Sequence, residues 1–96
     1  MNIRFLYLGQ LRTVAATNGD TILLSGPTTV ASALGELALR RPELRALLLD
    51  DESGQPRRSL LIFANETRLQ PADMLSTESE ITLMTPIAGG SDSLTD

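Results

Sequence analysis

The sequence contains no cysteine, no histidine and no lysine. Without cysteine the chain has no disulfide, no thiolate nucleophile and no sulfur ligand for a metal, and without histidine it lacks the commonest general base and metal ligand. All 8 basic residues are arginine, which excludes Schiff-base chemistry and any lysine acceptor for an isopeptide bond. Few catalytic groups remain, so we expect a protein that is not an enzyme and that binds no metal or cofactor.

Long apolar runs and an excess of positive charge are also missing. No apolar stretch approaches the roughly 20 residues that cross a bilayer, and the amino terminus does not have the layout of a secretion signal. The net charge of -4 leaves no basic surface for phosphate, which argues against nucleic acid. The sequence therefore predicts a cytoplasmic protein that does not act at a membrane.

Length and composition predict one globular domain. The 96 residues suffice for a single core, and 42% hydrophobic with 21% charged residues is ordinary for a folded chain. Alternating apolar residues predict a strand over residues 2–8, which Gly9 ends. A second short run over residues 21–25 follows Asn18-Gly19, and the two runs are expected to form a hairpin with a long loop.

A helix is predicted to begin after Thr29, whose hydroxyl suits the capping position. Apolar residues then recur at three- and four-residue spacing, as on one face of a helix: Val30, Ala33, Leu34, Leu37 and Ala38. Pro42 disfavours helical geometry at the residue before it, so the helix should stop there and a second short helical turn should open at the proline.

The residue pattern of the second half of the sequence predicts three more strands. Residues 59–64 form a continuous apolar run that is typical of a strand buried on both faces. Asn65-Glu66 makes a turn, with Asn65 expected in the left-handed conformation, before a short edge strand over residues 67–69. After a loop over residues 70–77, the last strand covers residues 80–84. The order predicts an α+β fold in which a mixed sheet packs on one main helix.

The segment after the last strand reads Thr-Pro-Ile-Ala-Gly-Gly and ends in Ser-Asp-Ser-Leu-Thr-Asp. Pro86 removes a backbone donor, and Gly89 and Gly90 have no side chain to hold them against a core. We expect a domain over residues 1–86, followed by a flexible tail over residues 87–96 that contains the two glycines and a six-residue extension.

These features together resemble the ubiquitin-like sulfur carriers, the family that includes the small subunit of molybdopterin synthase and the carrier of the thiamine pathway. The similar segments are the first strand with Gly9 and Leu11-Arg12, Thr29-Val30, residues 41–44, residues 64–66, and the ending Pro86-Ile87-Ala88-Gly89-Gly90. The resemblance implies a ubiquitin-like β-grasp fold, with the first and last strands as parallel neighbours at the centre of the sheet.

The resemblance also implies a function for the tail. In such carriers an adenylating enzyme of the ubiquitin-activating type uses ATP to activate the terminal carboxyl, here that of Gly90, which then becomes a thiocarboxylate. The residues that would thread the channel of the partner are Gly89, Ala88 and Ile87, because glycine allows close backbone approach. Arg12, Met84 and Pro86 are candidate partner contacts. A sulfur-accepting biosynthetic enzyme would receive the sulfur.

The extension matters because Gly90 is amide-bonded to Ser91 and an amide cannot be adenylated in this way. Some relatives carry extensions that a metalloprotease removes, so residues 91–96 are expected to be cleaved first. A carrier that is no longer used would also tolerate such an extension. A noncovalent ubiquitin-like binding module and a protein modifier remain alternatives, and the pathway stays open. The acidic residues Glu43 and Asp50 to Glu52 are interpreted as a solvated turn.

Overall fold

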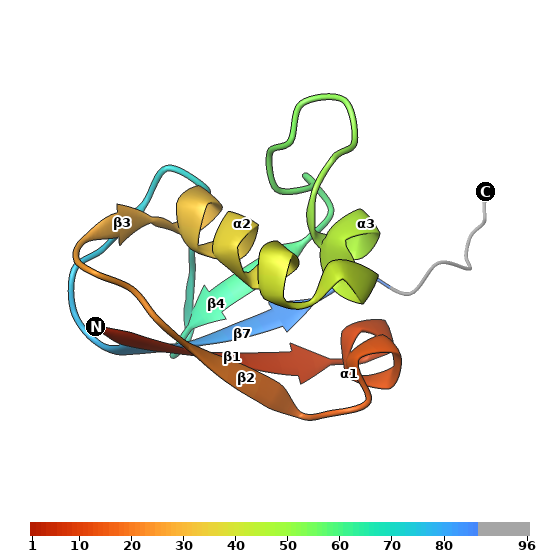
Figure 1. Ribbon diagram of the computed structural model, residues 1–96, viewed down its shortest axis with the longest axis horizontal. Helices are drawn as coiled ribbons and strands as arrows, with labels where there is room; N and C mark the ends of the chain where they lie inside the picture. Colours follow the sequence, from red (N-terminus) through yellow and green to blue (C-terminus); the bar gives the residue numbers. More distant parts are fainter. Residues whose placement is uncertain (87–96) are drawn as a thin grey trace.

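The computed structural model describes residues 1–86, and Figure 1 shows how its strands and helices are arranged. The elements follow in the order β1 (Asn2–Leu8), α1 (Gln10–Ala15), β2 (Gly19–Leu23), β3 (Thr28–Thr29), α2 (Val30–Arg40), the 3-10 helix η1 (Pro42–Leu44), α3 (Arg45–Leu48), β4 (Leu61–Ala64), β5 (Thr67–Arg68), β6 (Met74–Leu75) and β7 (Ser79–Met84).

Five strands form one mixed sheet in the order β2-β1-β7-β4-β5. The first and last strands, β1 and β7, run parallel from Ile3 beside Ser79 to Leu8 beside Met84, and both neighbouring pairs are antiparallel. Helix α2 crosses one face of this sheet (Figure 1). The predicted β-grasp fold is therefore confirmed, including the parallel pair at its centre.

The core lies between the sheet and α2. Ile3, Phe5 and Tyr7 of β1 are at most 1% exposed, because every second side chain of a strand points to the same face. The five apolar residues predicted for one face of the main helix are all buried against them. Burying each large apolar side chain contributes roughly 1.5–3 kcal/mol, so this layer provides most of the stabilisation.

The predicted helix boundaries are confirmed. The hydroxyl of Thr29 accepts a hydrogen bond of 3.1 Å from the backbone N–H of Ser32, which satisfies one donor of the first turn. Helix α2 ends at Arg40, and Pro42 opens η1. Asn65 has φ 57°, as expected for the turn between β4 and β5.

The region between β1 and β2 differs from the predicted long loop, because it contains α1. Leu11 and Ala15 of this six-residue helix are buried, and no side chain caps its start. Gly9 enters the helix with φ 61°, a conformation that glycine adopts without strain. So short a helix is stabilised by packing and not by local sequence, which explains why the pattern does not reveal it.

The loop predicted over residues 70–77 contains β6, which pairs with β3 in a second, two-stranded sheet. The prediction that the apolar run before Asn65 is buried on both faces is wrong. Leu60 and Ile62 are buried, but Leu61 and Phe63 are only half-buried, because α2 covers one face of the sheet and their side chains lie on the other.

Candidate functional site

The residues that carry the predicted chemistry, Gly90, Gly89, Ala88 and Ile87, lie outside the residues that the structure describes. The structure does show where the chain leaves the domain. Strand β7 ends at Met84, followed by Thr85 and the exposed Pro86. The candidate site is therefore built from the end of β7 and the elements around it.

Strand β7 is an interior strand of the five-stranded sheet. It pairs with β1 on one side and with β4 on the other, so its backbone is hydrogen-bonded along both edges. Ile81 and Leu83 point into the core and are fully buried. The segment that follows this strand therefore starts from a fixed position on the domain. A fixed starting point suits a functional group that a partner protein must bind in a defined position.

Helix α1 lies at the same end of the sheet, beside the ends of β1 and β7 (Figure 1). It carries Arg12, whose side chain is exposed. Met84 is half-buried on β7 and Pro86 is exposed just beyond it. The structure thus brings the three predicted partner contacts to one end of the molecule, although they come from two distant parts of the sequence.

A shallow groove of about 430 Å³ adjoins this end of β7. Its lining comes from α1, α3, the loop before β4 and the segment after β7: Gln10, Ala46, Leu47, Arg57, Ser59, Thr85 and Pro86. The guanidinium of Arg57 donates a hydrogen bond of 2.6 Å from Nε to the carbonyl oxygen of Ala46, which fixes the loop to α3. The hydroxyl of Thr85 is buried and has no hydrogen-bond partner within residues 1–86.

The face of the sheet opposite α2 carries a row of apolar side chains that the sequence did not reveal. Leu8, Met84 and Leu61 are direct neighbours across β1, β7 and β4, and the next row contains Leu6 and Phe63 on either side of Thr82. Leu8 is 41% exposed, and the other apolar members are half-buried. We call these five residues, Leu6, Leu8, Leu61, Phe63 and Met84, the open-face patch.

The open-face patch is continuous with the point where the chain leaves the domain, because Met84 belongs to both. An apolar surface next to a functional segment is typical of a protein-binding site. Charged residues lie beyond it on the same strands, where Arg4 and Glu80 form an exposed ion pair of 3.7 Å. Such an exposed pair contributes little to stability and leaves the patch apolar at its centre.

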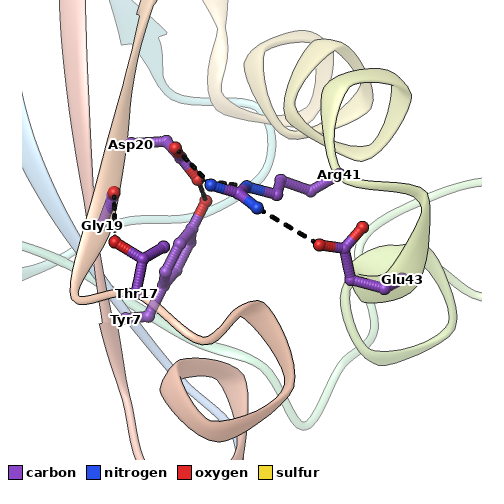
Figure 2. Close-up of polar contacts among 6 residues, drawn as sticks. All are labelled: Tyr7, Thr17, Gly19, Asp20, Arg41 and Glu43. Atoms are coloured by element: carbon purple, nitrogen blue, oxygen red, sulfur yellow. Dashed lines mark hydrogen bonds and ion pairs between the residues drawn. The ribbon is translucent and has the colours of Figure 1, made fainter.

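A polar cluster ties the β1–β2 pair to the end of α2 (Figure 2). The carboxylate of Asp20 accepts hydrogen bonds from Tyr7 Oη at 2.6 Å, from Arg41 Nε at 2.6 Å and from Arg41 Nη2 at 2.9 Å. Arg41 also donates to Glu43 at 3.3 Å. The bonds from Arg41 hold the pKa of Asp20 below its ordinary value, and burial raises the pKa of the Tyr7 phenol above its own.

We interpret this cluster as structural, because every strong donor in it is satisfied by a partner within the fold. We expect Asp20→Asn to lower the free energy of unfolding near neutral pH by about 1–2 kcal/mol, since it removes the charge from three hydrogen bonds. The folded pKa of Asp20 is depressed, so its stabilisation is complete above the unfolded value of about 3.9 and is lost as the pH falls through the lower folded value.

Urea unfolding at a series of pH values measures this effect, and the difference in stability between the two proteins should shrink progressively as the pH falls below about 4. The control is Asp51→Asn, because Asp51 is 73% exposed and meets Arg45 only at 3.6 Å. This variant should behave like the natural sequence. A stability difference for Asp20→Asn that is the same at every pH would contradict the interpretation.

Within residues 1–86 no three acidic, histidine or cysteine residues are grouped so that they could hold a metal ion. None of the helices in that part of the chain is long and apolar enough to span a bilayer. Comparison with known proteins identifies the class to which the chain belongs.

The sequence matches the ThiS family over residues 5–90. The chain belongs to the ThiS family. This match starts in β1 and includes every element from α1 to β7 as well as the two glycines. Members of the ThiS family are ubiquitin-like sulfur carriers, small carrier proteins that are not themselves enzymes, which confirms the predicted class.

Solved structures show the same fold. The crystal structure of small archaeal modifier protein 1 from Haloferax volcanii has a TM-score of 0.84 at 21% identity, covering 94% of this chain and all of that one. The modifier protein of the same name from Methanosarcina acetivorans has a TM-score of 0.75 at 19% identity, covering 93% and 96%. A protein described as molybdopterin converting factor, subunit 1, from Pyrococcus furiosus has a TM-score of 0.70 at 14% identity, covering 90% and 98%. A search among curated proteins gave no significant match.

Proposed function

We propose that this ThiS-family protein carries sulfur on the carboxyl of Gly90 after residues 91–96 have been removed. The observation that carries the proposal is the extent of the family match, which ends at Gly90 and leaves the six residues beyond it outside. The pairing of β7 with both β1 and β4 supports the proposal, because it fixes the position of Met84, where the strand ends beside the open-face patch.

The chemistry proceeds in two stages. The freed Gly90 carboxylate attacks the α-phosphorus of ATP on a partner enzyme, which releases pyrophosphate and leaves an acyl adenylate. A persulfide sulfur then attacks the acyl carbon, AMP departs with the bonding electrons, and a second thiol reduces the resulting disulfide to free the thiocarboxylate. The protein contributes the acyl group and its placement, while partner enzymes contribute every catalytic group. Because activation consumes ATP, which is available in the cytoplasm, we propose that the protein acts there.

Three kinds of partner follow from this proposal: a ubiquitin-activating-type adenylating enzyme, a sulfur-accepting biosynthetic enzyme and a metalloprotease that removes the extension. We assign the open-face patch as the surface that docks on the first two, with Arg12, Met84 and Pro86 contributing near the tail. We also propose that the folded domain ends at residue 86 and that the tail begins at residue 87.

The mass of the protein recovered from its native cell tests the proposed function directly, since the mass shows whether residues 91–96 are gone and whether sulfur has replaced an oxygen.

A noncovalent binding role is the second candidate, and the open-face patch is the observation that favours it. A module of that kind would bind its partner through the patch and would not require a free Gly90 carboxyl. The small archaeal modifier proteins similar in structure favour a third, attachment to other proteins. A modifier uses the same activated glycine and differs only in the group that accepts it.

The docking role of the open-face patch predicts the effect of Leu8→Asp. We expect this variant to lower the rate of adenylation at limiting protein concentration by about tenfold, because a charge would be buried among apolar groups at the interface. The measurement is ATP-pyrophosphate exchange catalysed by the adenylating enzyme from the same genome, with carrier that ends at Gly90.

Leu39→Asp is the matched control, since Leu39 is 75% exposed on α2, on the other side of the sheet. It should react like the natural sequence. Both variants should unfold in urea within about 1 kcal/mol of it, because neither side chain is in the core. Equal losses of rate in both variants would show that the patch is not the docking surface.

A further inference from the structure

Strand β2 lies at one edge of the five-stranded sheet, so one side of its backbone faces no other strand of residues 1–86. Two hydrogen bonds identify which of its residues face β1. The N–H of Leu24 donates a bond of 2.8 Å to the carbonyl oxygen of Met1, and at the other end the N–H of Tyr7 donates one of 2.8 Å to the carbonyl oxygen of Asn18. In an antiparallel pair, residues bonded in this way alternate with residues whose backbone groups point outward.

The outward backbone groups of β2 are those of Thr21 and Leu23, which lie between the bonded positions. None of the backbone hydrogen bonds between other segments of residues 1–86 involves them. Natural sheets protect their edges with lysine, proline or a bulge. Strand β2 contains neither lysine nor proline, and its register with β1 is unbroken. Its one charged residue, Asp20, is bound to Arg41. The edge is therefore open to another strand.

A groove of about 410 Å³ adjoins this edge at the end of β2. Leu23 and Leu24 line it from β2 and the residue beyond, and Ser32 and Glu36, one turn apart, line it from α2. Leu23 is 67% exposed. Glu36 takes part in none of the ion pairs within residues 1–86. The edge thus combines free backbone groups with an exposed apolar side chain and an unpaired carboxylate.

The free edge is separate from the end of β7. Leu23 lies beside Asn2 at the start of β1, whereas β7 ends beside Leu8 at the other end of that strand. Figure 1 shows β2 at the outer border of the sheet, with β1 between it and β7. A partner bound at the groove therefore leaves the end of β7 accessible to a second protein.

We propose that the free edge of β2 binds an extended segment of a partner protein as an additional antiparallel strand, with apolar residues beside Thr21 and Leu23 and a basic residue facing Glu36. Main-chain hydrogen bonds provide affinity in such strand addition, and alternate side chains provide specificity. Successive side chains of a strand point to opposite faces, so the residue between the two apolar ones faces α2. There the carboxylate of Glu36 favours arginine or lysine. The net charge of -4 favours a partner of the same sign.

The probe is the capped heptapeptide Ser-Thr-Val-Arg-Val-Thr-Ser, titrated at up to millimolar concentration into the isotope-labelled full-length chain. We expect the amide NMR signals of Thr21 and Leu23 to shift most, and their hydrogen exchange to slow by about tenfold at saturation. The valines are the residues whose backbone groups would face β2, so N-methylation of both should abolish binding. N-methylation of both threonines, whose N–H groups would face solvent, should preserve it.

Three outcomes of this titration would overturn the proposal. The first is the absence of any shift at millimolar peptide. The second is equal binding of the two methylated peptides, because the hydrogen bonds to the β2 edge would then not be formed. The third is a set of shifts centred on Phe63 and Met84, which would place the peptide on the open-face patch.

Glu36→Gln tests the charged contact. We expect it to weaken binding of the arginine peptide by about threefold at low salt and to leave binding of a peptide with glutamine in place of arginine unchanged. Glu52→Gln is the matched control, because it removes the same charge from an exposed residue in the loop after α3. It should bind the arginine peptide like the natural sequence. Equal weakening in both variants would show that only net charge acts and would overturn the role of Glu36.

Discussion

Full-length protein incubated with an adenylating enzyme, ATP and a sulfur source is expected to give no thiocarboxylate, whereas the chain ending at Gly90 should be converted almost completely. Adenylation requires a free carboxylate on the second glycine, and in the full-length chain that carbonyl is an amide to Ser91. The carboxylate of Asp96 is no substitute, because it is six residues further on and its α-carbon bears a side chain. Mass spectrometry distinguishes the two outcomes.

Stability and charge provide the controls for this comparison. Every large apolar side chain buried in the described structure lies between Ile3 and Leu83, so both proteins should unfold at the same urea concentration to within about 1 kcal/mol. Loss of Asp92 and Asp96 reduces the formal charge from -4 to -2, so the comparison is repeated at high salt to screen the difference. Thiocarboxylate on the full-length chain would contradict the requirement that residues 91–96 be removed first. Thiocarboxylate on neither form would contradict the carrier function and favour the noncovalent module.

The fold could be predicted from the sequence wherever a short-range rule determines the structure. The alternation of Ile3, Phe5 and Tyr7 fixes the buried side of β1, and Thr29 and Pro42 fix the two ends of α2. The parallel pairing of β1 with β7 came from the family resemblance and not from the pattern. No local rule specifies which two strands become neighbours when they are separated by the rest of the domain.

The unpredicted features all depend on contacts between distant residues. Helix α1 is stabilised by burial of Leu11, and the β3–β6 sheet has only two residues in each strand. The cluster around Asp20 joins residues 21 positions apart, so no spacing in the sequence indicates it. A signal was available for the open-face patch, because a continuous apolar strand on an open sheet must expose every second side chain to solvent or to a partner.

The sequence motif identifies the candidate residues of the site but not their surroundings in the fold. The ending Pro-Ile-Ala-Gly-Gly comes directly after the last strand, which is why the sequence points to Gly89 and Gly90, and the family match includes both. Their role stays a prediction. What the structure adds is the arrangement at the end of β7, where helix α1, which carries Arg12, lies at the same end of the sheet as Met84. The sequence separates them by most of its length.

The second large effect is expected from alanine at either glycine of the tail. In the chain ending at residue 90, we expect Gly89→Ala and Gly90→Ala each to reduce thiocarboxylate formation by about a hundredfold, equivalent to about 2.7 kcal/mol in the transition state. A methyl group on either α-carbon would crowd the acyl carbon in a channel shaped for bare backbone, and it restricts the dihedral angles that glycine can adopt. The measurement is the initial rate of thiocarboxylate formation, with ATP-pyrophosphate exchange separating activation from sulfur transfer.

Gly26→Ala is the matched control, because a Cβ at Gly26 would meet no atom within 4 Å and its backbone does not require positive φ. It makes the same chemical change on the folded domain and should leave the rate unchanged. All three variants should unfold like the parent chain, since none removes a side chain from the core. If the two tail variants form thiocarboxylate at the parent rate, the partner enzyme has no channel that requires glycine. If they are slow in sulfur transfer but normal in pyrophosphate exchange, the constraint lies at the sulfur donor, and the crowding argument applies to the second step and not to adenylation.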